Sequence, residues 1–259
     1  MRSGGLDDSD LYTYTSITLY MMIPLTIIGL RFQNAPYGKH YRTGWGPTIS
    51  PPLAWFLMES PTLWLTILLY PLGRHSSHPL PFFLTSLYVI HYINRTIIYP
   101  LRQKTVSKSQ FPISIALQAF LFNILNAYTQ TRSISHYRPD EDIRQVLVRF
   151  VLGGGLFVWG MWVNITSDAE LLRLRKKGKG KYVVPMGGWF DYVTCPNYMG
   201  ETVEWLGWSI MCWSPAAFGF FLFTCANLGM RAASSRKWYL EKFADEFPAE
   251  RMAFVPLLY

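Results

Sequence analysis

Six long apolar runs constrain the fold of this chain more than any other feature of its sequence. They cover residues 11–30, 52–72, 80–101, 111–128, 146–165 and 202–230. Each run approaches or exceeds the ~20 residues that an α-helix needs to cross a lipid bilayer. The sequence therefore predicts an all-α integral membrane protein, built as a bundle of transmembrane helices.

Composition supports a membrane setting and leaves no room for a separate soluble domain. Half of the residues are hydrophobic and only 15% are charged, whereas soluble domains carry about 25% charged residues. No separate soluble domain remains once the apolar runs are removed, so we expect residues 1–259 to form a single membrane-embedded domain. The start of the chain lacks the pattern of a secretory signal peptide, which predicts that the first span is retained.

The net charge of +8 raises the question of a nucleic-acid partner. The basic residues gather beside the apolar runs rather than along one soluble face. We therefore expect them to meet anionic membrane lipids, and we expect no nucleic-acid partner. The cysteines Cys195, Cys212 and Cys225 follow no disulfide or metal-binding spacing, so we expect neither a disulfide framework nor a bound metal ion.

The number of spans depends on how the 202–230 run is divided. Lys and Arg accumulate on the cytoplasmic side of membrane proteins, and here they favour the loops after the first, third and fifth runs. A single helix over 202–230 would then place the basic C-terminal tail on the opposite side. A break at Trp213-Ser214-Pro215 removes the conflict, because proline interrupts a helix. We therefore predict seven transmembrane helices. The alternative is six, in which residues 202–230 form one kinked helix. We also place residues 166–199 and the tail at one cytoplasmic face.

Residues 160–208 combine strongly apolar flanks with many polar groups. These groups are Asn164, Asp168, Arg173, Arg175, Tyr182, Asn197, Glu201 and Glu204. Asn164 and Asp168 are four residues apart, so they share one helical face. Glu201 and Glu204 are three residues apart and also face the same way. Polar groups at a membrane boundary usually serve a charged ligand. As alternatives, Asp168 caps or pairs with Arg173, and the glutamates cap a helix N-terminus.

Three more polar residues lie in the second and third apolar runs. A carboxylate inside lipid is costly unless it is paired, protonated or hydrated, so Glu59 either serves a ligand or orders helix packing through a hydrogen bond. Tyr92 lies near the middle of its run, where its hydroxyl needs a partner. Arg95 follows on the same helical face, and it either serves a ligand or extends to the membrane interface.

The order and spacing of several motifs identify a resemblance to a known family. The motifs are Ala54-Trp55-Phe56-Leu57-Met58-Glu59-Ser60-Pro61, His91-Tyr92-Ile93-Asn94-Arg95-Thr96, Asn164-Ile165-Thr166-Ser167-Asp168, Leu172-Arg173-Leu174-Arg175-Lys176, Pro185-Met186-Gly187-Gly188, Gly200-Glu201 with Glu204-Trp205, and Leu228-Gly229-Met230-Arg231 with Trp238-Tyr239-Leu240. Together they closely resemble the steroid 5-alpha-reductase family over roughly residues 35–259.

The resemblance implies an integral-membrane enzyme that uses NADPH to reduce the C4–C5 double bond of 3-oxo-4-ene steroids. It implies that Glu59 and Tyr92 form the catalytic pair and bind the 3-oxo group of the substrate. Hydride delivery to the β-carbon of an enone moves charge onto the carbonyl oxygen, so hydrogen-bond donors aimed at that oxygen lower the barrier. Trp55 and Trp205 are candidates for the wall of an apolar substrate slot, although core filling is the more common use of tryptophan.

The resemblance also implies a set of NADPH-binding residues. They are Arg95, Asn164, Asp168, Arg175, Tyr182, Asn197, Glu201 and Tyr239. A planar guanidinium suits phosphate binding, which favours Arg175 over the lysines that follow it. The chain has no strand–GxGxxG–helix unit of a Rossmann fold. Membrane helices and residues 166–199 must therefore hold the dinucleotide.

These expectations bring NADPH from the cytoplasm and the steroid from the bilayer. We expect a monomer, in the endoplasmic reticulum membrane of a eukaryote or in the inner membrane of a bacterium. Three alternatives remain open: a membrane methyltransferase of the isoprenylcysteine type, a non-enzymatic lipid-binding or transport module, and a related reductase acting on another sterol or polyprenol bond. Methyl transfer to a carboxylate needs no group that stabilises an enolate, so the Glu59/Tyr92 pair argues against the first.

Overall fold

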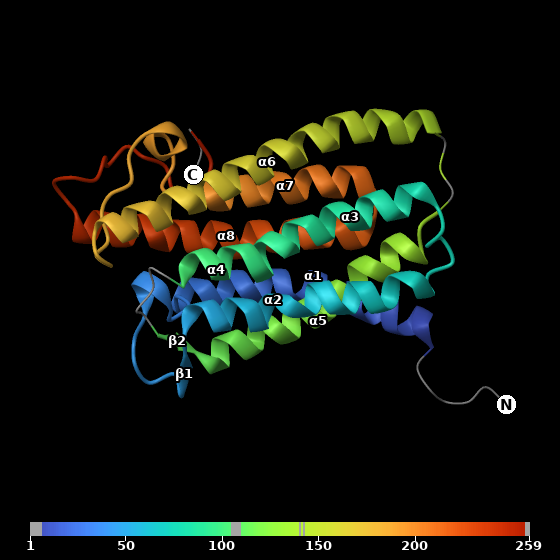
Figure 1. Ribbon diagram of the computed structural model, residues 1–259, viewed down its shortest axis with the longest axis horizontal. Helices are drawn as coiled ribbons and strands as arrows, with labels where there is room; N and C mark the ends of the chain where they lie inside the picture. Colours follow the sequence, from blue (N-terminus) through green and yellow to red (C-terminus); the bar gives the residue numbers. More distant parts are fainter. Residues whose placement is uncertain (1–6, 105–109, 140, 142, 257–259) are drawn as a thin grey trace.

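Long helices run side by side in the computed structural model of the chain, which describes residues 7–104, 110–139, 141 and 143–256 (Figure 1). The α-helices are α1 (Asp8–Phe32), α2 (Pro51–Leu69), α3 (Pro79–Ile93), α4 (Tyr99–Gln103), α5 (Ile113–Ser135), α6 (Ile143–Lys177), α7 (Pro196–Cys212) and α8 (Pro215–Lys242). Short 3₁₀ turns cover Gly38–His40, Tyr70–Leu72 and Gly188–Asp191, and the two-residue strands β1 (Thr48–Ile49) and β2 (Phe111–Pro112) form one antiparallel pair.

Four of the helical segments are long and apolar enough to cross a membrane. They cover Asp8–Phe32, Pro51–Leu72, Val146–Lys177 and Pro215–Lys242. Their outer faces carry exposed apolar side chains. Leu25, Leu68 and Val151, for example, are 65%, 62% and 69% exposed. An apolar surface of this extent marks a site of interaction, here with lipid. The structure therefore agrees with the prediction of an all-α membrane protein.

The 202–230 run divides at the position that the sequence predicts. Helix α7 ends just before Trp213, which adopts a left-handed conformation with φ 47° and ψ 47°. Ser214 then caps α8 by accepting a hydrogen bond from the backbone N–H of Ala217. Pro215 opens α8, a position where its missing N–H costs nothing. The alternative of a single kinked helix is therefore wrong.

The rod formed by α3 and α4 contains a wider turn of π-helical hydrogen bonding at Asn94–Ile98. Pro100 follows this turn. It has no N–H to pair with the carbonyl four residues earlier, and its ring crowds that carbonyl, which favours a locally widened ladder. Turns of this kind frequently mark functional sites, and this one contains Arg95, a buried guanidinium inside the bundle.

Helices α6 and α7 approach each other closely along a glycine seam, with Gly153 and Gly160 on α6 and Gly200 and Gly207 on α7. A Cβ added at Gly160 would lie 2.5 Å from the carbonyl oxygen of Gly200, and one added at Gly153 would lie 2.5 Å from that of Gly207. Small residues let helix backbones come together in membranes, where no hydrophobic force drives them. The seam therefore holds the polar side chains of α6 close to those of α7.

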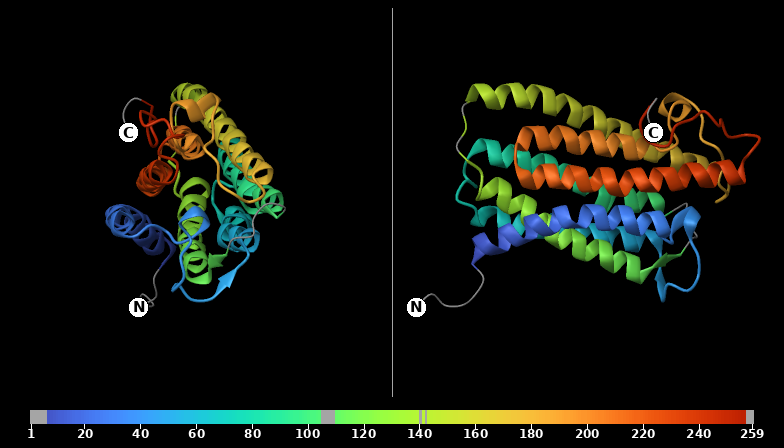
Figure 2. Two further views of the ribbon diagram at one scale, coloured as in Figure 1. Left: turned by 90° about the vertical axis from the view of Figure 1, so that its left-hand side faces the viewer. Right: turned by 180° about the vertical axis from the view of Figure 1, so that it is seen from behind.

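One end of the bundle gathers the segments that the sequence assigns to the cytoplasm. The β1–β2 pair and the C-terminal ends of α6 and α8 lie together there (Figures 1 and 2). The tail braces the segment before α7, because Val193 forms a parallel bridge with Met252 and buried Arg251 donates a hydrogen bond to the Pro185 carbonyl oxygen at 2.9 Å. The expectation that residues 166–199 and the tail share one face is confirmed, and the cytoplasmic identity of that face stays a prediction.

The glycine seam generates the first testable prediction. Gly160→Ala should destabilise the bundle by about 1–3 kcal/mol, because the added methyl group overpacks the contact between α6 and α7. Gly155→Ala is the matched control, since a Cβ there meets nothing within 4 Å, and it should be neutral or stabilise by about 0.5–1 kcal/mol. Thermal unfolding in one detergent compares the two variants, and equal stability would rule out tight packing at the seam.

Candidate active site

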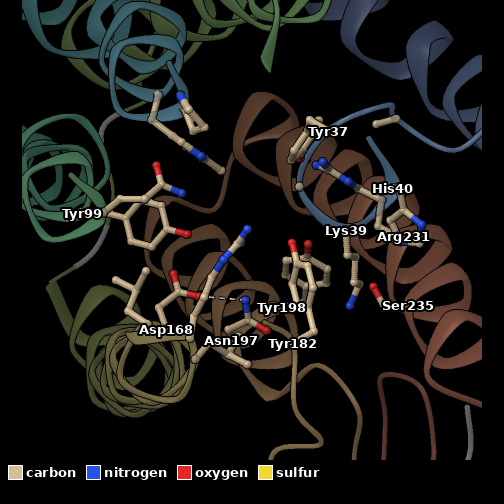
Figure 3. A pocket seen from close by; sticks show the side chains of 18 of the residues that line it. Tyr37, Lys39, His40, Tyr99, Asp168, Tyr182, Asn197, Tyr198, Arg231 and Ser235 are labelled. Carbon is tan, nitrogen blue, oxygen red and sulfur yellow. Dashed lines mark hydrogen bonds between the residues drawn. The ribbon is translucent and has the colours of Figure 1, made fainter. Parts of the chain in front are cut away.

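Two neighbouring cavities share part of their walls. The first has a volume of about 230 Å³ and lies at the loop-bearing end of the bundle (Figure 3). The second has a volume of about 540 Å³ and is lined mainly by residues of α1, α2, α5 and α8. Trp55 and Arg95 line both cavities, so a ligand in one lies directly beside a ligand in the other.

Most of the predicted cofactor residues line the first cavity. They are Arg95, Asp168, Arg175, Tyr182, Asn197 and Tyr239. They come from four separate stretches of the chain, and Figure 3 shows Asp168, Asn197 and Tyr182 around one space. Of the two remaining predictions, Glu201 lines the second cavity, and Asn164 is buried and bonds to Glu201.

Arg95 is the centre of a buried polar network. Its Nη1 donates to Asp168 Oδ2 at 3.3 Å, and its Nη2 lies 4.0 Å from Glu201 Oε2. Asp168 Oδ1 in turn accepts from Asn197 Nδ2 at 2.8 Å. The guanidinium carbon also lies 4.4 Å from the ring centre of Trp55. A snorkelling role for Arg95 is therefore excluded, because its charge points into the bundle and is paired there.

Asn164 joins the two helices that carry this network. Its Nδ2 donates to the Asn197 carbonyl oxygen at 3.0 Å and to Glu201 Oε2 at 3.2 Å. The shared face predicted for Asn164 and Asp168 is confirmed, since both side chains reach α7. The alternative pairing of Asp168 with Arg173 is wrong, because Arg173 instead binds Glu170.

The two glutamates of α7 point at different partners on the α3 rod. Glu201 faces Arg95, whereas Glu204 Oε1 lies 2.8 Å from His91 Nδ1 in a completely buried contact. They are the sixth and ninth residues of α7, beyond its first turn, so the alternative that they cap the helix N-terminus is wrong. Both carboxylates instead tie α7 to the segment that carries Tyr92.

Glu59 and Tyr92 both line the second cavity. Glu59 Oε2 accepts a hydrogen bond from Asn123 Nδ2 of α5 at 3.1 Å. Tyr92 is 4% exposed and packs on Tyr88, with ring centres 4.6 Å apart. The structure therefore brings one carboxyl and one phenol to the same apolar space, next to the Arg95 network.

The two predicted tryptophans occupy different places. Trp55 lines both cavities at their junction and lies edge-on to Tyr99. Trp205 is 1% exposed and lies in the aromatic core, with its ring 5.9 Å from that of Tyr92 and 4.5 Å from that of His91. Trp205 therefore supports Tyr92 and His91 from behind, while Trp55 is positioned to touch a ligand.

Arg175 lines the first cavity and is half-buried. Its guanidinium carbon lies 4.5 Å from the ring centre of Tyr182, and its Nε is buried with no hydrogen-bond partner among the described residues. Burial also raises the pKa of the Tyr182 phenol. A half-buried guanidinium with an unpaired Nε donor favours an anionic ligand in this cavity.

Several residues of the first cavity were not predicted from the sequence. They are Lys39, Tyr99, Tyr198, Arg231 and Ser235. Lys39 lies over Tyr239, with its Nζ 4.5 Å from the ring centre, and burial lowers the pKa of its ammonium group. In the sequence, Lys39 stands out only as one of the basic residues in the loop after the first apolar run. Its position between Gly38 and His40, in a tight turn between two spans, was the available signal.

Comparison with known proteins gives the family. Residues 109–259 match the family described as 3-oxo-5-alpha-steroid 4-dehydrogenase. The chain is 55% identical over 257 residues to steroid 5-alpha-reductase DET2 of Arabidopsis thaliana, covering 97% of this chain and 98% of that relative. The chain belongs to the steroid 5-alpha-reductase family.

Other relatives give the same assignment across a wide range of organisms. The chain is 53% identical to steroid 5-alpha-reductase DET2 of Gossypium hirsutum, over 97% of this chain and 99% of the relative. It is 34% identical to 3-oxo-5-alpha-steroid 4-dehydrogenase 1 of Homo sapiens, over 88% of each chain. The protein is therefore an oxidoreductase of the steroid 5-alpha-reductase family, which implies a nicotinamide cofactor. This decides against the methyltransferase and the non-enzymatic transport module.

His40 generates a pH prediction at this site. Burial, with Lys39 and Arg42 nearby, lowers the pKa of its imidazole to about 4, and its Nε2 is buried with no hydrogen-bond partner among the described residues. The unfolded chain has a histidine pKa of about 6.5. Between these values the unfolded state binds a proton that the folded state does not, so stability should fall as the pH drops from about 6.5 towards 4.

The measurement is the unfolding midpoint at pH 7.5 and at pH 5 for the native protein and His40→Gln. We expect the midpoint of His40→Gln to fall less between these two pH values, because this variant has no imidazole to protonate. His78→Gln serves as the control outside the cavity. An equal fall in the native protein and in His40→Gln would contradict the prediction.

Proposed function

We propose that this protein reduces the C4–C5 double bond of a 3-oxo-4-ene steroid to the 5-alpha-3-oxosteroid, with NADPH as its cofactor. One observation carries the proposal: a polar cavity and a larger cavity share a wall at Trp55 and Arg95. The larger cavity contains one carboxyl and one phenol, Glu59 and Tyr92. The names of the relatives support the same reaction for this chain.

The residues of the first cavity suit a dinucleotide. Buried polar atoms in or beside its wall, Asn164 Oδ1, Arg175 Nε and Gln103 Oε1, have no hydrogen-bond partner among the described residues. Unpaired polar atoms are costly inside a protein, so a polar ligand is expected to satisfy them. We assign Arg175 with Tyr182 to a phosphate group, and Asp168 with Asn197 to hydroxyl or amide groups. A bound reduced nicotinamide supplies the hydride for C5.

Glu59 and Tyr92 act on the ketone. We assign both as hydrogen-bond donors to the 3-oxo oxygen, with Glu59 in its protonated form. When C5 gains a hydride, the π pair of the C4–C5 double bond forms a double bond between C3 and C4. The π pair of the carbonyl group then moves onto the 3-oxo oxygen, where negative charge develops. Two donors fixed in a site without bulk water stabilise this charge strongly. C4 then takes up a proton from solvent, and the ketone is restored.

The other assigned residues position the cofactor and the substrate relative to each other. Arg95 lies between the two cavities, where its charge is balanced by Asp168 and Glu201. Trp55 forms the apolar wall at the same junction, and Trp205 supports Tyr92. Positioning two reactants next to each other in this way supplies a large share of a catalytic rate.

The topology completes the proposal. The chain crosses the membrane seven times, with the loop-bearing end and the cofactor cavity on the cytoplasmic side and the steroid entering from the bilayer. This arrangement follows from the break before Pro215 and from the basic segments at the loop-bearing end. It gives a multi-pass protein of the endoplasmic reticulum if the organism is a eukaryote, or of the inner membrane if it is a bacterium, working as a monomer.

The ketone-binding pair gives a direct test. Glu59→Gln and Tyr92→Phe should each lower kcat for NADPH-dependent reduction of progesterone or testosterone by about 10²–10³, the loss typical of one donor to a developing oxyanion. Glu170→Gln and Tyr192→Phe change the same groups at positions outside the lining of both cavities, Glu170 half-buried and Tyr192 exposed, and should leave kcat unchanged. A native rate in Glu59→Gln or Tyr92→Phe would remove that residue from the mechanism.

The cofactor cavity gives an independent test by binding alone. Arg175→Met should weaken NADPH binding about tenfold or more, because one charge-assisted contact to phosphate is lost. Lys176→Met removes the neighbouring exposed charge and is the matched control. Calorimetric titration of NADPH into each variant in detergent measures the dissociation constant. Equal affinities in the two variants would show that phosphate binds elsewhere.

A further inference from the structure

Helix α5 carries a stripe of three amide side chains that the proposed chemistry does not use. Asn123, Asn126 and Gln130, which we call the α5 amide stripe, are spaced three and four residues apart and so share one helical face. They are 5%, 0% and 1% exposed. Buried amides within a membrane bundle need partners. Asn123 bonds to Glu59 at the second cavity, whereas Asn126 bonds to Tyr88 and Gln130 to the Ala216 carbonyl oxygen.

The orientation of the Asn123 amide is fixed by a backbone carbonyl. Its nitrogen Nδ2 lies 2.6 Å from the Met58 carbonyl oxygen, which accepts hydrogen bonds and cannot donate them. The same nitrogen lies 3.1 Å from Glu59 Oε2. Oε2 is therefore the accepting oxygen of the carboxyl group. In the protonated form of Glu59 the hydrogen is left on Oε1, the oxygen free to donate to a ligand.

The orientation of the Asn126 amide is fixed through Gln130. Gln130 Nε2 lies 3.0 Å from the Ala216 carbonyl oxygen, so this atom is a donor, and it also donates to Asn126 Oδ1 at 3.0 Å. Asn126 must then present its Nδ2 to Tyr88, whose hydroxyl oxygen lies 3.4 Å away. Tyr88 thus accepts from Asn126.

Tyr88 packs on Tyr92, with their ring centres 4.6 Å apart. The hydrogen bonds of Asn126 and Gln130 therefore order the aromatic packing beside Tyr92. The hydrogen bond of Asn123 goes instead to Glu59, a group that we assign to the ketone.

We propose that Asn123 of the α5 amide stripe is a positioning residue that makes Glu59 a hydrogen-bond donor towards the substrate carbonyl. The inference rests on the proposed function, because it assumes that Glu59 binds the ketone. Asn123 occupies the accepting oxygen Oε2 and so directs the acid hydrogen on Oε1 at the substrate. Asn123 acts through Glu59 and not on the reacting atoms.

Double-mutant cycles test the proposal, because a residue that acts only through another loses its effect when the other is changed. Asn123→Leu, which keeps the size but removes the donor, should lower kcat about tenfold in the native background, the effect of one hydrogen bond of typical strength. In the Glu59→Gln background, the same change should lower single-turnover NADPH oxidation less than about twofold. NADPH affinity should be unchanged throughout, which confirms the fold.

Asn126→Leu is the matched control on the same stripe, because Asn126 bonds to Tyr88 and Gln130 rather than to Glu59. Any loss of kcat in Asn126→Leu should be equal in the native and the Glu59→Gln backgrounds. Thr129→Val is a second control, because this buried hydroxyl on α5 donates to the Leu125 carbonyl oxygen of its own helix. It should leave kcat unchanged.

The outcomes separate this inference from the function on which it rests. Native kcat in Asn123→Leu, or an equal loss in the native and the Glu59→Gln backgrounds, would overturn the positioning role. If Glu59→Gln itself turned over at the native rate, the proposed function would fail first, independently of Asn123.

Discussion

The buried charge of Arg95 is the constraint around which the rest of this structure is arranged. A guanidinium inside a membrane bundle is tolerated only when it is paired, and its partners come from two other helices, Asp168 of α6 and Glu201 of α7. Those helices must therefore lie close together, which the glycine seam between them allows. Removing Arg95 would leave both carboxylates without their cation, and breaking a buried pair usually costs several kcal/mol.

The same network divides the interior into two chemical environments. On one side, cationic and amide groups surround a space suited to phosphates and hydroxyls, with Arg175 and Lys39 on its wall. On the other side, α1, α2, α5 and α8 enclose a larger space whose polar groups include Glu59 and Tyr92. A reaction between a water-soluble cofactor and a lipid-soluble substrate needs such a boundary, and Arg95 with Trp55 forms it.

Features with a local physical cause were predictable from the sequence. The apolar runs predict helices because length and hydropathy act along one segment, and Pro215 predicts the break between α7 and α8 because its backbone lacks a donor. The spacing of Asn164 and Asp168 predicts a shared face because residues four apart lie on the same side of a helix. The family resemblance placed Glu59 and Tyr92 at the second cavity and six of the eight predicted cofactor residues at the first.

Features that depend on distant partners were not predictable in this way. Lys39 becomes a cavity residue only because its loop folds onto α8, and Arg251 is buried only because the tail reaches Pro185. Asn123 and Asn126 lie in a run read simply as apolar, although several amides in one span are themselves a signal. Their partners on α2 and α3 are set by tertiary packing.

One measurement tests the central claim most directly: an experimental structure of the protein with NADP⁺ and a 3-oxo-4-ene steroid bound. The account predicts the steroid in the second cavity, with its 3-oxo oxygen within about 3.2 Å of both a Glu59 carboxyl oxygen and the Tyr92 hydroxyl, and the nicotinamide beside C5 near Arg95. A steroid bound with its ketone pointing away from this pair, or a nicotinamide separated from C5 by protein, would contradict it.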